Sequence, residues 1–208
     1  MSEVSAKNDG FGSMIKLGLV LALYATVSCT VLAVVNNFTA PKIAHNQEVK
    51  INNAMKAFFA DDDLTFESVS DYEPATSGTI KIEQVIIAKD GEKITGGAAQ
   101  VSGPTYDQGT ILVGMKTDGT VTGLQFLKLS DSPGFGLKAN DSTFQLPNGK
   151  TFYGQFEGKN AAEGFKSGVN FDAISGATIT SDGVAGLLNE GTGCLFKYFA
   201  NHNGGQNE

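Results

Sequence analysis

The sequence predicts an α+β domain with an antiparallel sheet, preceded by one N-terminal transmembrane helix. Residues 17–35 carry no charge and are mostly apolar. Residues 80–129 contain four short runs of strand-forming residues, broken by Asp-Gly turns. A helical segment then closes the chain. Because the strands come together and the helix follows them, without regular βαβ alternation, the α+β class is favoured.

The apolar run, LGLVLALYATVSCTVLAVV, predicts an uncleaved membrane anchor. About 20 apolar residues cross a bilayer, whereas a signal peptide has an apolar core of about 7–15 residues ending in small residues. This run is longer and finishes at Val34-Val35-Asn36-Asn37. Lipoprotein cleavage before Cys29 is disfavoured because apolar sequence continues beyond it. We therefore expect a cytoplasmic segment at 1–16 and a transmembrane helix at 17–36, in the lipid bilayer.

Charge does not orient this anchor. Lys7 and Lys16 precede the span, and Lys42 and Lys50 follow it, so the positive-inside rule gives no answer. The short N-terminus and the large C-terminal domain favour a single-pass protein of the bacterial cell membrane, with its domain on the extracytoplasmic side.

Beyond the anchor, residues 37–63 are expected to be either a stalk or the first helix of the domain, with helix over Pro41–Phe59. The domain itself is expected at 64–200. Its predicted strands are Ile80–Ala88, Glu92–Gln100, Thr110–Lys116 and Thr120–Leu129, with hairpin turns at Asp90-Gly91 and Asp118-Gly119. A final helix over Asp182–Phe199 precedes a polar tail, 201–208, that is expected to be disordered.

Composition excludes several function classes. The formal net charge is -7 and all 15 basic residues are Lys, which disfavours a nucleic-acid partner. Cys29, Cys194, His45 and His202 are the whole set of Cys and His, and they form no ligand pattern for zinc, haem or an iron–sulfur cluster. Any redox chemistry would therefore come from an organic cofactor.

Residues 172–178 resemble the D-x-x-[ST]-G-A-T sequence on which a flavin transferase attaches FMN to a threonine hydroxyl through a phosphoester. Asp172, Ser175, Gly176, Ala177 and Thr178 fill all the specified positions. The resemblance implies that Thr178 carries covalent FMN and that Asp172 serves recognition during flavinylation. It also implies that Ser175, Gly176 and Ala177 shape the acceptor turn and contribute to cofactor binding. On local physics alone, an ordinary loop-to-helix turn explains the same residues.

The residues that follow the acceptor threonine suit the start of a helix. Thr180 and Ser181 are expected either to cap that helix or to bond a phosphate, and a helix start favours negative charge.

A second glycine loop, Ser130–Lys138, follows the last predicted strand. It resembles the E-T-P-G-L-G-x-K element of FMN-binding domains, with Asp, Ser and Phe in place of Glu, Thr and Leu. The resemblance implies flavin contacts from Asp131, Ser132, Pro133, Gly134, Gly136, Leu137 and Lys138. Lys138 would neutralise phosphate or a reduced ring, or is simply a solvated surface residue. Tyr106 either stacks on the ring or packs beside a turn.

Residues 152–159, FYGQFEGK, are similar to an F-x-x-Q-F-x-G-K stretch of the same domains. Together these motifs make the chain resemble the G subunits of Rnf electron-transport complexes. The resemblance implies a membrane-anchored relay with covalent FMN inside a ferredoxin:NAD oxidoreductase that pumps Na⁺ or H⁺. Its partners would be subunits carrying flavin and iron–sulfur centres, and a flavin transferase during maturation.

Four alternatives stay open from the sequence. The C subunit of the sodium-translocating NADH:quinone reductase shares the motifs but is usually longer. A stand-alone flavin-binding surface protein shares the acceptor sequence. An independent flavoenzyme would need a proton donor beside the ring, and a non-redox adhesion or ligand-binding domain would need no Thr178 hydroxyl.

Overall fold

The structure is a computed structural model that describes residues 9–60 and 63–203. The chain forms two compact units, which divide between Glu48 and Val49. The tail expected at 201–208 is in part helical, because the last helix continues to Asn203; residues 204–208 lie outside the described residues, as do residues 1–8 and 61–62.

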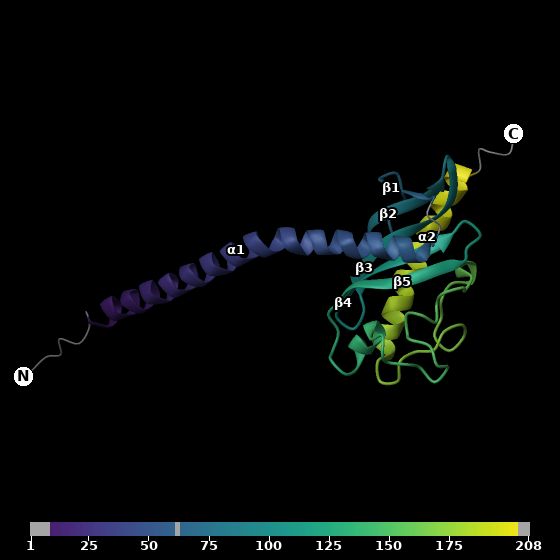
Figure 1. Cartoon of the computed structure of the whole chain (residues 1–208). Coiled ribbons are helices and arrows are strands. Elements are labelled where there is room, and N and C mark those ends of the chain that lie inside the picture. Colours follow the sequence, from purple (N-terminus) through teal and green to yellow (C-terminus); the bar gives the residue numbers. More distant parts are fainter. Residues whose placement is uncertain (1–8, 61–62, 204–208) are drawn as a thin grey trace, which may run out of the picture. The chain divides into compact units, whose positions relative to one another are not determined.

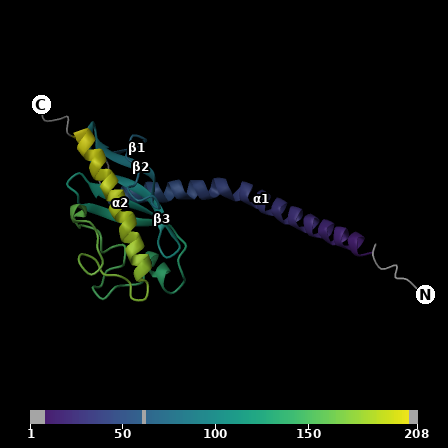
Figure 2. The same ribbon diagram turned by 180° about the vertical axis from the view of Figure 1, so that it is seen from behind.

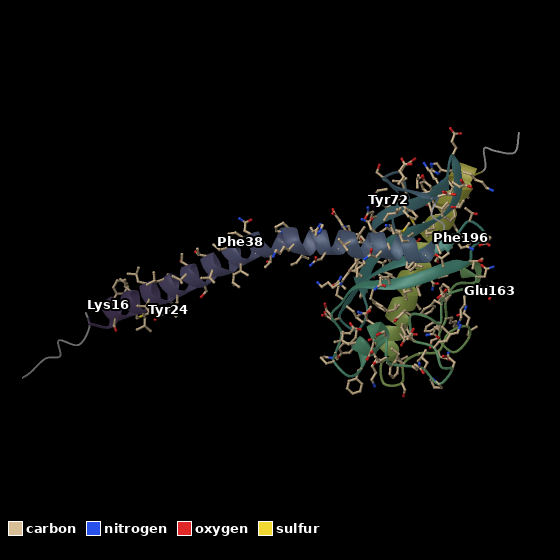
Figure 3. All side chains as sticks on the ribbon, viewed as in Figure 1. Lys16, Tyr24, Phe38, Tyr72, Glu163 and Phe196 are labelled. Atoms are coloured by element: carbon tan, nitrogen blue, oxygen red, sulfur yellow. The ribbon has the colours of Figure 1, made fainter. Side chains whose placement is uncertain are left out.

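The N-terminal segment is one helix, α1 (Asp9–Phe58), which runs through Pro41 without a break. A proline in a helix interior removes one backbone hydrogen bond and can kink the helix, but α1 continues on both sides of Pro41. The side chains of Tyr24 and Phe38 project outward from α1 and are 69% and 76% exposed (Figure 3). Within the described residues, α1 is the one helix long and apolar enough to cross a membrane.

The second unit contains a five-stranded antiparallel meander in the order β1-β2-β3-β4-β5 (Figure 1). The strands are β1 (Thr65–Val69), β2 (Lys81–Asp90), β3 (Lys93–Pro104), β4 (Gln108–Lys116) and β5 (Val121–Leu129). The four predicted strands and the α+β class are confirmed. Strand β1 was not predicted, because a five-residue edge strand with four exposed positions has no apolar alternation to detect.

The sheet is covered on both faces. Successive side chains of a strand point to opposite faces, so Val85 and Ile87 enter one apolar cluster while Ile86 and Ala88 enter another. Helix α2 (Thr178–Asn203) crosses the face of the sheet that carries the first cluster and contributes apolar side chains to it (Figure 2). The last turns of α1 contribute side chains to the second cluster, among them Met55, which is 1% exposed.

Between β5 and α2 the chain forms loops and two short 3₁₀ helices, η1 (Gly136–Asn140) and η2 (Ala161–Glu163). An aromatic cluster replaces regular structure as the core of this region. The ring centroids of Phe156 lie 5.5 Å from Phe152 and 5.3 Å from both Phe165 and Phe171. Aromatic pairs in such geometries stabilise a fold beyond their buried area, and this cluster holds the loop that leads into the acceptor sequence.

Candidate functional site

Two loops that are far apart in the sequence meet at the start of α2 and border a cavity of about 480 Å³. Ligand pockets commonly measure roughly 300–1,000 Å³, so one cofactor of ordinary size is accommodated. The cavity is lined by Tyr106, Ser132, Phe135, Gly136, Gly176, Ala177, Thr178, Ile179 and Thr180. Both glycine loops singled out in the sequence therefore contribute to one site.

Thr178 is the first residue of α2 and its side chain is exposed at the cavity. The first turn of a helix carries N–H groups without helical partners and the positive end of the helix dipole. An anion attached at Thr178 would thus lie where the backbone favours negative charge.

The backbone of the acceptor turn has a specific shape. Gly176 has φ +79°, a conformation that side chains with a Cβ rarely adopt, and a Cβ there would lie 3.4 Å from the Phe135 ring. The next residue, Ala177, donates its N–H to the carbonyl of Ile174 at 2.9 Å. The tight turn and the aromatic ring beside it account for glycine at this position.

Ser181 closes this turn from inside the helix. Its buried hydroxyl accepts a hydrogen bond from the N–H of Ile174 and donates one to the carbonyl of Ala177, both at 3.0 Å. The expectation that Thr180 and Ser181 cap the helix is wrong, because α2 begins at Thr178 rather than Asp182 and both residues lie within its first turn. The Ser181 hydroxyl thus joins Ile174 and Ala177, on the two sides of the turn at Gly176.

Asp131 lies buried behind the cavity, 4% exposed, and ties the second glycine loop to the β3–β4 turn. Its carboxylate accepts hydrogen bonds from the Thr105 hydroxyl at 2.6 Å and from the N–H groups of Asp107 and Tyr106 at 2.9 and 3.3 Å. Burial by itself raises the pKa of Asp131, but these bonds and one from the Thr180 side chain offset burial and hold the pKa below its ordinary value. Asp131 therefore stays ionised and positions Tyr106.

Gly136 allows the second glycine loop to contact the start of α2 closely. A Cβ at this position would lie 2.6 Å from both Asp131 Cβ and Thr180 Oγ1, so only glycine permits this contact between them. Thr180 is 1% exposed, and it lines the cavity while bonding Asp131.

Several predicted contacts lie outside the cavity lining: Asp131, Pro133, Gly134, Leu137, Lys138, Ser175 and Ser181. The Lys138 ammonium instead lies over the Phe144 ring, 5.2 Å from its centroid. Tyr106 does face the cavity and is 64% exposed, as is Phe135 at 58%. The cavity thus offers two aromatic surfaces and several hydroxyl groups, and neither histidine is among its lining residues.

Asp172, six residues before Thr178, is held from two sides. Its exposed carboxylate accepts a hydrogen bond from Asn148 Nδ2 at 2.8 Å, and its backbone is bonded to the Gln155 side chain. Sequence reasoning gave no role to Asn148, Gln155, Thr105 or Ile179. Gln155 belonged to the matched 152–159 stretch, which was the one available signal for it.

Gly183 sets how closely α2 approaches the β3–β4 turn, since a Cβ there would lie 2.6 Å from Thr105 Cα and 2.9 Å from Pro104 O. We expect Gly183→Ala to destabilise the domain by about 1–3 kcal/mol through overpacking, despite a gain in helix propensity. Gly193→Ala on the same helix meets nothing within 4 Å and should be neutral or stabilising. Urea unfolding of both variants checks this, and equal midpoints would contradict the close contact at Gly183.

Two parts of the chain match known protein families. Residues 106–192 match the FMN-binding domain family, and residues 1–57 match the RnfG N-terminal region. The G subunit of the Na(+)-translocating ferredoxin:NAD(+) oxidoreductase complex of Acetobacterium woodii is 31% identical over 192 residues, covering 84% of this chain and 87% of that protein. The G subunit of the ion-translocating oxidoreductase complex of Erwinia tasmaniensis is 28% identical over 187 residues, covering 85% and 87%.

Among solved structures, the crystal structure of NqrC from Shewanella oneidensis aligns with a TM-score of 0.49 and 17% identity, over 78% of this chain and 99% of that one. The family assignment depends on the sequence matches, which span both the anchor and the domain and confirm the resemblance drawn from the motifs. The chain therefore belongs to the G-subunit family of Rnf-type ion-translocating oxidoreductase complexes and contains that family's FMN-binding domain.

Proposed function

We propose that this protein is the membrane-anchored electron carrier of an Rnf-type complex and that FMN is linked through its phosphate to Thr178 Oγ. The observation that carries the proposal is the exposed Thr178 hydroxyl, at the first residue of α2, on the edge of a cavity bordered by both glycine loops. The proposed organisation keeps residues 1–16 cytoplasmic, 17–36 in the membrane and the FMN domain at 64–200.

The residues present fit FMN. The helix start at Thr178 suits a phosphate, the left-handed Gly176 leaves the backbone approachable, and Tyr106 and Phe135 offer aromatic faces for a flat ring system. Bound flavin supplies one- and two-electron redox chemistry that no side chain of this cavity provides. Ser132, Gly136 and Thr180 would complete the pocket wall, and Asp131 would act from behind it by fixing the Tyr106 turn.

Attachment requires a flavin transferase and a flavin adenine dinucleotide as donor. Thr178 Oγ forms a bond to the phosphorus of the FMN half, and the anhydride bond of the donor breaks. AMP leaves, and the hydroxyl proton passes to a base of the transferase. Asp172 would serve recognition in this step. A covalent link retains the cofactor on an extracytoplasmic domain, where lost flavin would be diluted.

In the assembled complex, the anchor would hold the flavin near partner subunits that carry flavin and iron–sulfur centres, and so raise the effective concentration of one redox group next to another. The relatives' names support a ferredoxin:NAD oxidoreductase coupled to ion translocation. We propose that this complex moves Na⁺ or H⁺ across the cell membrane, and that the FMN domain lies on the extracytoplasmic side.

Intact mass of denatured protein from native membranes, followed by peptide mapping, tests the proposal. The expected result is an added mass of FMN less one water on the peptide that contains Thr178. Unmodified Thr178 in native material, or flavin that is lost on denaturation, would contradict the covalent link.

A further inference from the structure

We infer that Gln155 is a positioning residue for flavinylation: it fixes the backbone at Asp172 and thereby presents the segment from Asp172 to Thr178 to the transferase in one geometry. This inference rests on the proposed function. The buried amide of Gln155, distant in sequence from Thr178, would thus affect how readily the transferase recognises Thr178.

The Gln155 side chain bonds the backbone of Asp172 in the way that a neighbouring β-strand would, through both the N–H and the carbonyl group. Its Oε1 accepts a hydrogen bond from the Asp172 N–H at 2.8 Å, and its Nε2 donates to the Asp172 carbonyl at 3.1 Å. The same Nε2 donates to the carbonyl of Phe152 at 3.0 Å. Both ends of one amide thus bind both backbone groups of one residue.

The Gln155 side chain is itself firmly placed, because it is 2% exposed, bonds the Phe152 carbonyl and is followed in the chain by Phe156 of the aromatic cluster. A buried amide with all its bonds made has one low-energy orientation, whereas an unpaired one is costly. The backbone of Asp172 is therefore held in place by a side chain that belongs to the domain core.

The segment from Asp172 to Thr178 is consequently fixed at both ends. Gln155 holds Asp172, and the Ser181 hydroxyl holds Ile174 and Ala177. The side chains of Asp172 and Thr178, at the two ends of the segment, are exposed. A partner that must recognise the first and modify the second gains affinity when their backbone is already in the bound geometry.

The chain offers a matched control in Asn189, which makes the same kind of amide clamp on another loop. Asn189 Oδ1 accepts from the Phe165 N–H at 2.7 Å, and Nδ2 donates to the Phe165 carbonyl at 3.0 Å. A general need for amide clamps would make both residues matter equally for flavinylation. A positioning role predicts that Gln155 matters more.

The test uses the full-length protein without flavin, in detergent, with purified flavin transferase and flavin adenine dinucleotide. Gln155→Met should raise the KM for the acceptor protein about three- to tenfold, the effect of losing one or two net hydrogen bonds, with little change in kcat. Asn189→Leu releases the backbone of Phe165 rather than that of Asp172, so it should raise KM less than Gln155→Met does. Hydrogen exchange should quicken at Asp172 in Gln155→Met and at Phe165 in Asn189→Leu.

Gln155→Glu is a second variant that keeps the test decisive if Gln155→Met does not fold. Burial and the two facing carbonyl groups favour the protonated carboxyl in this variant, which keeps an oxygen to accept the Asp172 N–H and one O–H donor in place of the two N–H donors of the amide. Exchange at Asp172 should therefore remain slow, while KM rises less than for methionine. Unchanged KM in both Gln155 variants, with the wild type labelled normally, would overturn the positioning role alone. Failure of the wild type to take up flavin would instead refute the proposed function.

Discussion

Replacing Thr178 by valine is expected to remove all covalent flavin while leaving the fold intact. Valine matches threonine in shape but has no oxygen to bond the FMN phosphorus. Thr178 is exposed at the helix start, where a methyl group replaces the hydroxyl without disturbing any buried contact. In-gel flavin fluorescence after denaturation, together with intact mass, should show no flavin, and electron transfer by membranes should fall to background.

Thr117→Val provides the matched control, since Thr117 is an exposed threonine in the β4–β5 turn, away from the cavity lining. That variant should carry as much flavin as the wild type. Covalent flavin in Thr178→Val would place the attachment elsewhere. Full membrane activity without covalent flavin would remove the relay from the function of this subunit.

Replacing Asp131 by asparagine is expected to give the largest loss of stability among the site residues. The buried carboxylate accepts bonds from Thr105, Tyr106 and Asp107, and an amide cannot satisfy them all. A loss of about 2–3 kcal/mol in unfolding free energy is expected at neutral pH. Because the Tyr106 turn is released as well, flavin loading should also decrease.

The pH dependence of stability identifies the charge as the cause. The folded-state pKa of Asp131 lies below its ordinary value of 3.8, so its contribution is complete above that value. It is lost as pH falls through the lower folded-state pKa. The gap between wild type and Asp131→Asn in urea midpoint should therefore narrow on moving from about pH 7 to about pH 3.

Asp141→Asn is the control for this titration. The pKa of Asp141 is also lowered, by hydrogen bonds from the side chain and the N–H of Thr143, but the residue is exposed in a loop. Its replacement should leave the urea midpoint nearly unchanged at both pH values. A gap for Asp131→Asn that stays constant with pH would mean that shape rather than charge accounts for its effect.

Local patterns predicted the regular elements well. The strands of 80–129 followed from β-branched runs and two Asp-Gly turns, and the fold class followed from their order. The start of α2 was misplaced by four residues, from Thr178 to Asp182, because Thr180 and Ser181 have the composition of caps. Their hydroxyls instead bond groups that precede α2: the Asp131 carboxylate in the case of Thr180, and the Ile174 N–H and the Ala177 carbonyl in the case of Ser181.

The sequence by itself determined the apolar N-terminal helix and the antiparallel sheet, and it predicted Thr178 as the flavin acceptor, since apolar length, alternation and a short motif are properties of neighbouring residues. Tertiary structure alone decided that both glycine loops border one cavity, that Asp131 lies behind it and that Gln155 holds Asp172. Those contacts join residues 17 or more positions apart. They depend on which buried polar groups find partners once the core has formed, and no local pattern encodes that outcome.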